Sequence, residues 1–350
     1  MATPSPVAIG VLDDTPGGIQ PKLLARAFEL VFAELARAGR CDRSFELLVE
    51  RAEGLPWGTA HAVEKAHAAL AARGALVIVG PAIGDNALVA TPCADASRIP
   101  TLNFAGTEEA RSEFMFQLQV GSHEEEPLLL ARQLVARAAA RCALVFERSA
   151  IGARYAAFFD DACSCLGLAQ VARVGVSAGA TDLAPAAEAA LGAQPDALVY
   201  LGLGAGLGAL RAELARRGAG PPLYANSSGM FGWVAPERAR ELDGVCYVDV
   251  VSEGNPVLGD ALKSLGIAFD QGPMAAMYLD LARLAAEGIA RAPVLTSAGV
   301  RAGLERIKAL PAALGRAGTQ MGFGHCERSA YKGDYLVLRR WEGGRSRELA

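Results

Sequence analysis

The stretch LVIVGPAIGDNALVATPCADASRIPTLNFAGT, residues 76–107, decides the fold. An apolar strand at 76–79 runs into Gly80 and Pro81, a helix-like segment follows, and a second short strand spans 99–104. Each strand ends in small residues with free backbone N–H groups at the start of the next segment. In an open α/β sheet, two such turns side by side are the usual place for a small ligand.

The composition favours some classes of protein for this chain and excludes others. Its 350 residues are 52% hydrophobic and 21% charged, which is typical of a packed α/β protein with more than one core, so two lobes are expected. A net charge of -4, without a run of interleaved basic and aromatic residues, offers no face to nucleic acid. No apolar stretch approaches the roughly 20 residues that span a bilayer, so no membrane insertion is expected.

The first residues and the cysteines bear on the compartment. The N-terminus reads MATPSP before a strand begins at Val7, without the basic and apolar regions of a secretory signal. Seven cysteines without paired spacing are typical of reduced thiols in a cytosolic protein. We therefore expect a cytoplasmic protein, with a periplasmic protein whose signal has been removed as the alternative. Whether Met1 is the natural start stays open.

Alternating strand and helix patterns predict a first lobe. A buried strand at 7–12 precedes a helix with apolar residues at 3.6-residue spacing, and a strand at 45–49 precedes a second helix at 59–72. Together with strands at 76–79 and 101–104 these form a four-strand βαβ series. Its strands are expected to be parallel because each returns through a helix.

A second series begins at Ser122, which with Glu125 forms a capping box at the start of a helix that reaches Arg137. The whole pattern predicts the α/β class, with two doubly wound, parallel-sheet, Rossmann-like lobes. The further expected elements are strands at 143–146, 171–176, 197–200, 223–225 and 245–251, helices at 274–290 and 297–310, and a last strand at 335–339.

The order and spacing of these elements resemble the type I periplasmic binding proteins. The branch in question binds leucine, isoleucine and valine, and it also contains cytosolic amide sensors. The resemblance implies a ligand cleft between two lobes and three crossovers, near Gly121, Val250 and 323–328. It assigns residues 1–120 and 250–324 to the N-terminal lobe, and residues 121–249 and 325–350 to the C-terminal lobe.

The resemblance also implies ligand contacts in the first lobe. In amino-acid-binding members, a hydroxyl residue after the Gly-Pro turn and a threonine after the next strand hold the ligand's carboxylate. Ala105 and Thr107 stand at such family positions, and Thr107 would offer its hydroxyl to a ligand. The usual serines after the Gly-Pro turn are replaced by Gly84 and Asp85. An aspartate there repels an anionic ligand unless it only caps the helix.

In the second lobe, family members place an aromatic residue over the ligand and an acid against its amine. Ile151 stands at the aromatic position here, and Ser228 lies nearest the position of the acid. An ammonium without a carboxylate partner in a closed cleft costs several kcal/mol, so we expect a neutral or partly apolar ligand. Four aromatic residues near strand ends would line such a cleft or belong to the cores: Trp57, Phe104, Phe231 and Trp233.

A glycine-rich turn supports an alternative hypothesis, an NAD(P)-dependent α/β oxidoreductase. Within residues 202–208, Gly204 and Gly206 begin a match to the dinucleotide fingerprint that ends at Ala209. That fingerprint requires an acid at the end of the next strand, which reads Tyr-Ala-Asn at 224–226. We therefore interpret the glycines as a tight turn with Gly204 facing the ligand, and expect no cofactor.

Metal and catalytic motifs are not found. The pairs at 163–165 and 325–326 lack the second pair of a structural zinc site, and there is no P-loop or nucleophile elbow. The leading hypothesis is a non-catalytic protein that closes by hinge motion over a small molecule, for transport or sensing. Its partner would be an ABC transporter permease or a regulatory protein. A third hypothesis is a pair of lobes that binds no ligand and serves as a scaffold. The ligand and the oligomeric state stay open.

Overall fold

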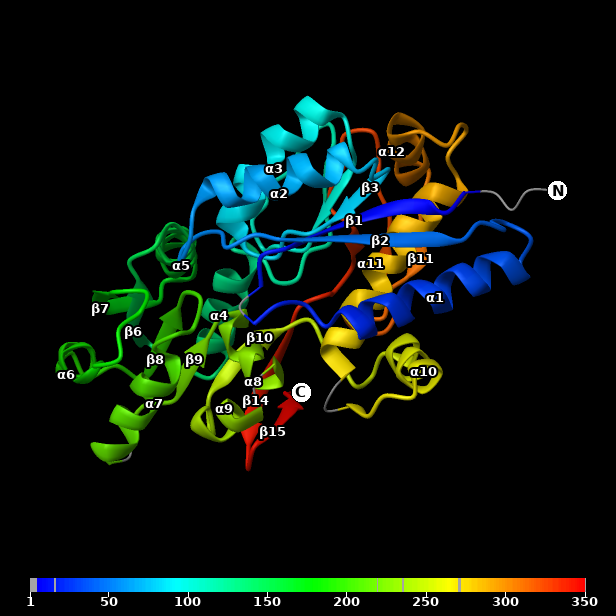
Figure 1. Cartoon of the computed structure of the whole chain (residues 1–350). Helices are drawn as coiled ribbons and strands as arrows, with labels where there is room; N and C mark the ends of the chain where they lie inside the picture. The colour runs from blue at the N-terminus through cyan, green and yellow to red at the C-terminus, as the bar shows by residue number, and fades with distance from the viewer. Residues whose placement is uncertain (1–4, 16, 219, 235, 270–271, 350) are drawn as a thin grey trace. The chain divides into compact units, whose positions relative to one another are not determined.

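The computed structural model describes residues 5–15, 17–218, 220–234, 236–269 and 272–349, and the chain divides into two compact units (Figure 1). Unit 1 comprises Met1–Val120 and Ser252–Tyr335, and unit 2 comprises Gly121–Val251 and Leu336–Ala350. Each unit is therefore built from two separate stretches of the chain, which crosses from one unit to the other three times.

Unit 1 is organised around a parallel five-stranded sheet in the order β2-β1-β3-β4-β5. The chain starts inside this sheet and winds outward in both directions, which makes the unit doubly wound. Its inner strands are runs of buried residues, as expected for strands that helices cover on both faces. The strands are β1 (Val7–Asp13), β2 (Phe45–Arg51), β3 (Val77–Val79), β4 (Thr101–Asn103) and β5 (Met115–Gln117).

Helices cover both faces of the unit 1 sheet: α2 packs against α3 on one face, and α1 packs against α11 on the other (Figure 1). Helix α11 is buried along almost its whole length, which explains why most of its residues are apolar. The described helices are α1 (Pro21–Arg37), α2 (Ala60–Ala72), α3 (Gly84–Ser97), α10 (Pro256–Leu265), α11 (Gly272–Ala290) and α12 (Ser297–Glu305). A small antiparallel sheet consists of β11 (Leu310–Pro311), β12 (Gln320–Met321) and β13 (Tyr331–Lys332).

Unit 2 contains a seven-stranded sheet in the order β15-β14-β10-β9-β8-β6-β7. Its first five strands along the chain are parallel, whereas β14 runs antiparallel to β10 and β15 antiparallel to β14. The strands are β6 (Arg141–Glu147), β7 (Ala169–Val176), β8 (Ala197–Leu201), β9 (Leu223–Ala225), β10 (Cys246–Asp249), β14 (Val337–Glu342) and β15 (Arg345–Glu348).

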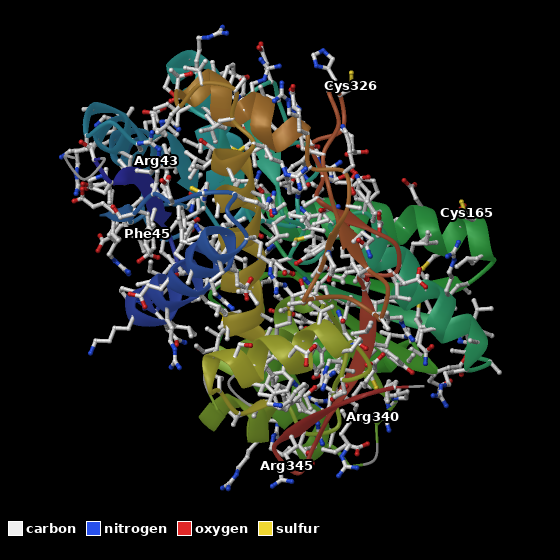
Figure 2. All side chains as sticks on the ribbon, turned by 90° about the vertical axis from the view of Figure 1, so that its right-hand side faces the viewer. Arg43, Phe45, Cys165, Cys326, Arg340 and Arg345 are labelled. Carbon is white, nitrogen blue, oxygen red and sulfur yellow. The ribbon has the colours of Figure 1, made fainter. Side chains whose placement is uncertain are left out.

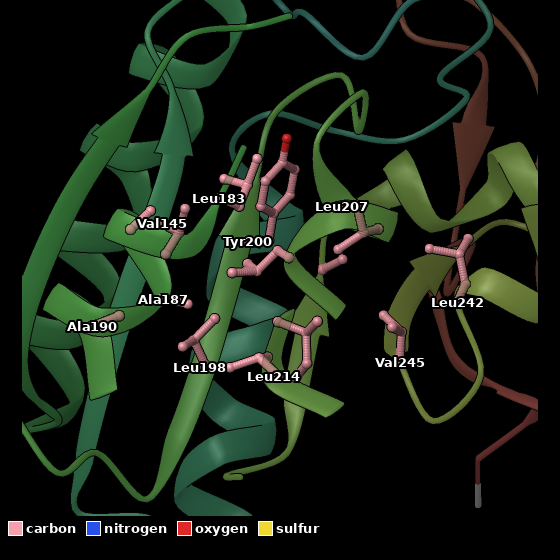
Figure 3. Close-up of a cluster of buried hydrophobic side chains, with 14 of the residues drawn as sticks. Val145, Leu183, Ala187, Ala190, Leu198, Tyr200, Leu207, Leu214, Leu242 and Val245 are labelled. Atoms are coloured by element: carbon pink, nitrogen blue, oxygen red, sulfur yellow. The ribbon is translucent and has the colours of Figure 1, made fainter. Parts of the chain in front are cut away.

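The core of unit 2 lies where helices pack on β8. Figure 3 shows Leu198 and Tyr200 of this strand among apolar side chains from neighbouring helices, including Ala187 and Leu214. All four side chains are buried. The helical elements are α4 (Glu125–Ala136), α5 (Ala150–Leu166), α6 (Ala184–Gly192), α7 (Leu207–Arg216), a 3₁₀ turn (Ser227–Met230), α8 (Phe231–Val234) and α9 (Pro236–Glu241).

The structure corrects several predicted elements. Strand β5 was not predicted, and the sheet of unit 2 is not wholly parallel, because the chain ends in the antiparallel pair β14 and β15. The helix predicted at 297–310 ends at Glu305, since Leu310 belongs to β11. The last predicted strand, 335–339, instead spans Val337–Glu342.

Helix α4 is capped differently from the predicted box. The Ser122 hydroxyl accepts the N–H of Glu125 at 3.0 Å, as the motif requires. The carboxylate that returns to the N–H of Ser122, however, belongs to Glu126, at 2.7 Å. Glu125 is exposed. The sequence therefore indicated the right capping hydroxyl but the wrong acid, and the helix itself begins three residues later, at Glu125.

The last crossing between the units falls after Tyr335, later than the 323–328 that the resemblance implies. Residues 325–335 stay in unit 1 because they pair there: Ser329 forms a parallel bridge with Gln117, and β13 pairs with β12. The first two crossings follow Val120 and Val251.

Candidate functional site

Asp14 closes the carboxyl end of β1 in unit 1. Its buried carboxylate accepts the backbone N–H of Ala82 at 2.7 Å, the N–H of Ile83 at 3.0 Å and the side-chain amide of Asn86 at 2.9 Å. Burial raises its pKa, while these donors act in the opposite direction. The start of α3, where an anionic ligand would be favoured, thus already holds a carboxylate of the chain itself.

Asn86 extends this network to the loop after β2. Its side-chain oxygen accepts the N–H of Leu55 at 2.8 Å, and its amide donates to the carbonyl of Leu55 at 3.1 Å. Gly54 is required beside it, because a Cβ there would lie 2.6 Å from the Asn86 side chain. Trp57, a predicted ligand residue, lies on this loop with 63% of its surface exposed. It is not part of the core of unit 1.

The two turns of the opening sequence lie side by side, as the parallel pairing of β3 and β4 requires. The N–H of Phe104 donates to the carbonyl of Pro81 at 3.0 Å, and Ala105 packs against Ala87 of α3. Phe104 and Ala105 are both buried. The other two predicted residues here lie in the first turn of α3, Gly84 buried and Asp85 partly exposed.

Thr107, which follows the turn after β4, has a buried hydroxyl. The residue is 0% exposed, and its Oγ1 has no hydrogen-bond partner in the part of the chain that the structure describes. Its backbone is nevertheless fixed, because the Gln117 amide donates to the carbonyls of Ala105 at 2.7 Å and Thr107 at 2.9 Å. Arg111 in turn donates to the Gln117 side-chain oxygen at 2.6 Å. Sequence reasoning did not predict this clamp, because Gln117 lies in the unpredicted β5.

In unit 2, a carboxylate of the chain itself occupies the backbone N–H groups of the glycine-rich turn between β8 and α7. The carboxylate of Glu147, at the end of β6, accepts the N–H of Leu203 at 2.8 Å, the N–H of Gly204 at 2.9 Å and the hydroxyl of Tyr200 at 2.5 Å. Glu147 is 0% exposed. A dinucleotide pyrophosphate would need these N–H groups, so the turn does not fit the oxidoreductase hypothesis.

Three predicted ligand residues of unit 2 lie in this turn or near it. Gly204 has a φ of +91°, and a Cβ there would lie 2.7 Å from that of Ser228, so the two residues are neighbours. The Ser228 hydroxyl donates to the side-chain oxygen of Asn226 at 2.8 Å. Ile151 is buried in the first turn of α5, whose start contacts Glu147 through Gly152.

The two predicted aromatic residues of unit 2 have different outcomes. The side chain of Phe231 lies outside the described part of the structure. Trp233 donates from its indole N–H to Asp249 at 2.9 Å, and its ring lies 5.2 Å from that of Trp341. Trp233 packs against the main core of unit 2.

Glu126 is the centre of a buried network that was not predicted. Besides the N–H of Ser122, its carboxylate accepts the N–H and hydroxyl of Ser227 and the hydroxyl of Tyr155. Burial raises its pKa to about 7, although each of these donors lowers it. The network joins the first residues of unit 2 to the turn after β9. His123 beside it is neutral at pH 7, since burial and Arg154 lower its pKa to about 3.

We expect the ionisation of Glu126 to make stability depend on pH. Its pKa lies above the ordinary 4.5 in the folded chain, so folding favours the protonated form. This stabilisation is fully present below pH 4.5 and is lost as the pH rises towards 7, by about 3 kcal/mol in total. In urea unfolding from pH 4.5 to 8, Glu126→Gln should show a flatter pH dependence than the wild-type protein. The exposed neighbour provides the control: Glu125→Gln should keep the wild-type slope.

The described residues also bear on metal binding and on membrane insertion. Among them, no group of three or more His, Cys, Asp or Glu side chains is arranged to hold a metal ion. None of the described helices has the length and apolar character that crossing a membrane would require.

Comparison with known proteins gives a consistent picture. A family model described as "Periplasmic binding protein" matches residues 6–334. Among solved structures, a type 1 periplasmic binding protein from Bordetella pertussis Tohama I is similar, with a TM-score of 0.82, 20% identity and coverage of 99% of this chain and 100% of the other. An ABC transporter substrate-binding protein from Desulfitobacterium hafniense in complex with Leu has a TM-score of 0.80, 18% identity and the same coverage. A leucine binding protein from Thermotoga maritima has a TM-score of 0.81, 15% identity and 98% coverage of both chains. The search of curated proteins finds no match.

Proposed function

Because the chain belongs to the periplasmic binding protein family, we propose that it binds a small, neutral and partly apolar solute and closes over it by hinge motion, without catalysis. The family resemblance and the two-lobe α/β fold inferred from the sequence are confirmed. The family and the solved relatives are binding proteins, so the expectation of a non-catalytic protein is confirmed as well.

The position of Asp14 is the observation that carries the proposed ligand class. A ligand carboxylate at the start of α3 would have to share the N–H groups of Ala82 and Ile83 with a buried carboxylate of the chain. Two carboxylates at one site repel each other in a medium of low dielectric constant. A neutral ligand avoids this repulsion and can still use the free hydroxyl of Thr107.

The carboxylates of unit 2 do not restore a site for an amine. Glu147 already accepts three donors, and Glu126 accepts four. At Glu126, whose oxygens accept four donors, an ammonium group would have to displace one of them, and at Glu147 it would have to enter the buried turn that encloses the carboxylate. This supports a ligand without the two opposite charges of an amino acid.

We infer the partner and the compartment of this protein from its relatives. One is named as a substrate-binding protein of an ABC transporter, and we propose a permease of that class as the partner of this chain. The expected cytoplasmic location has no support from the comparisons, whereas the periplasmic alternative fits the description of the family. We therefore propose that the protein works in the periplasm.

Thermal unfolding against a ligand panel tests the proposed function. The panel contains leucine, valine and phenylalanine, aliphatic amides, neutral aromatic compounds, aromatic acids and NAD(H). A ligand at 100 times its Kd stabilises the protein by about 2.7 kcal/mol, which gives a shift of several degrees. We expect a shift with amides or neutral aromatic compounds and none with the amino acids. A shift with leucine or valine would contradict the proposed ligand class, and a shift with NAD(H) alone would contradict the binding-protein assignment.

The ligand found in this way locates the site through Thr107. Thr107→Val keeps the shape of the side chain and removes a hydroxyl without a described partner, so ligand affinity should fall about tenfold while the free protein keeps its stability. Thr101→Val is the matched control. It removes a buried hydroxyl that donates to Ile99, and should lower stability without changing affinity. Unchanged affinity in Thr107→Val would show that the site lies elsewhere.

A further inference from the structure

Two buried cysteines of unit 2, one on a strand and one on the helix that packs against it, have their sulfur atoms close together. The Sγ atoms of Cys142, in β6, and Cys163, in the last turn of α5, lie 3.9 Å apart. Cys142 is 0% and Cys163 3% exposed. By contrast, Cys165 and Cys326 lie at the surface with their sulfur atoms outward (Figure 2). The seven cysteines are free thiols in this structure.

The fold fixes the approach of these two thiols. Strand β6 is paired on both sides, with β7 and β8, so the backbone of Cys142 is held inside the sheet. Helix α5 packs against β6, and its end is closed by Gly167, whose N–H donates to the carbonyls of Cys163 and Ser164. A disulfide bond is about 2 Å long, so the two Sγ atoms have to approach each other by about 2 Å to form one.

We propose that Cys142 and Cys163 are a cross-linking pair that forms an intramolecular disulfide with a small-molecule disulfide, such as oxidised glutathione, as the oxidant. One cysteine thiolate attacks a sulfur of oxidised glutathione, which gives a mixed disulfide and releases one glutathione thiolate. The second cysteine thiolate attacks the protein sulfur of the mixed disulfide and releases the other glutathione. The two thiol protons end on the two glutathione molecules. The protein loses two electrons, and the glutathione disulfide gains them.

The contact between the thiols also favours one of them as the nucleophile. The hydrogen bond from Cys163 lowers the pKa of Cys142, although burial and the charge of Asp160 act against it. The same contact, together with burial, raises the pKa of Cys163. Cys142 is therefore the thiol that ionises first and the natural attacker, because the thiolate is the reactive form.

The cross-link would act on the candidate site of unit 2. It closes a loop of 21 residues in sequence separation, and this loop contains Glu147 and the start of α5. It would thus tie down the turn whose carboxylate fills the glycine-rich segment before α7. This inference uses the fold of unit 2 alone, so it stands whether or not the proposed ligand class is right.

Refolding in a redox buffer tests the proposal, because unfolding gives the oxidant access to both buried thiols. The full chain is unfolded and reduced, then refolded in mixtures of reduced and oxidised glutathione, quenched in acid, and its free thiols are alkylated. Cleavage after arginine yields Cys142 in peptide 142–148 and Cys163 in peptide 155–173, which also contains Cys165. Mass spectrometry should find these two peptides joined, with the other cysteines alkylated.

Variants identify the partner of Cys142. Cys165→Ser should give the same cross-linked pair of peptides as the wild-type protein, whereas Cys163→Ser should lose it. Thermal unfolding adds a second measurement: oxidation should raise the Tm of the wild-type protein and of Cys165→Ser by several degrees. The proposal is overturned if Cys142 and Cys163 are both alkylated in the wild-type protein under oxidising conditions. It is also overturned if Cys142 pairs equally well with Cys165 in Cys163→Ser.

Discussion

Arg339→Met is expected to lower the free energy of unfolding of unit 2 by about 3–5 kcal/mol, because it leaves the Asp249 carboxylate buried without its cation. Both side chains are 0% exposed, and the Arg339 Nε lies 3.8 Å from Asp249 Oδ2. Burial raises the pKa of Asp249, and the charge of Arg339 opposes that rise. Without the arginine the carboxyl should take up a proton more readily, so the deficit should shrink as the pH falls.

Arg339 also connects two segments of unit 2 that are far apart in the sequence. The Arg339 guanidinium also donates to the carbonyl of Val251 at 2.8 Å and to that of Ser346 at 3.0 Å. Val251 is the last residue before the chain leaves unit 2, and Arg339 follows shortly after it returns at Leu336. One buried cation therefore holds the two chain segments that continue into unit 1.

Urea unfolding of matched variants measures this effect. Arg340 precedes Trp341 on the same strand but is partly exposed and contacts Cys246, so Arg340→Met should change the free energy of unfolding by less than about 1 kcal/mol. In the double variant Arg339→Met/Asp249→Asn, removal of both charges should recover part of the loss at pH 8. Equal losses in Arg339→Met and Arg340→Met would show that the buried pair does not stabilise the unit.

Local sequence patterns were enough to predict most of the fold. Alternating apolar strands and 3.6-residue helical spacing identify β1, α1 and the units' other long elements because burial on a defined face leaves a period in the sequence. Strand β5 (Met115–Gln117) is as short as β3 and β4, but the chain crosses to unit 2 after Val120, so no helix of unit 1 follows β5 to mark it as part of the alternating series. The final hairpin did carry a usable signal, since Gly343 and Gly344 both have the positive φ that its turn requires.

The site was predictable only in part, and the reason is distance along the chain. The turns after β3 and β4 follow from strand ends and small residues, which are local features. The carboxylates that fill the turns come from far away: Asp14 lies 68 residues from Ala82, and Glu147 lies 57 residues from Gly204. A single sequence contains no local pattern that records such pairs. The neutral ligand class inferred from the missing acid stays a prediction, and the two internal carboxylates are the structural argument for which we propose it.

Asp14→Ala is expected to lower the free energy of unfolding of unit 1 by about 4 kcal/mol. The substitution leaves the N–H groups of Ala82 and Ile83 and the amide of Asn86 without their shared acceptor. Each buried donor without a partner costs about 1–3 kcal/mol. The space vacated by the carboxylate is lined by these donors at the start of α3, which is the environment that a small anion prefers.

Formate should therefore restore part of the lost stability of Asp14→Ala, because it supplies the missing carboxylate. It should leave the Tm of the wild-type protein unchanged, since Asp14 already occupies the position. Asp85→Ala is the matched control in the first turn of α3, and formate should not raise its Tm. If formate stabilised all three proteins alike, its effect would be that of a general salt.

The same variant decides whether Asp14 controls the ligand class. Once its carboxylate is gone, the freed N–H groups can receive the carboxylate of an amino acid, so leucine should raise the Tm of Asp14→Ala more than an equal concentration of leucinamide does. In the wild-type protein leucine should have no such advantage, because two carboxylates would then share one set of donors. If leucine stabilised the wild-type protein as well as the variant, the internal carboxylate would be compatible with an anionic ligand group, and the case for a neutral ligand would lose its main support.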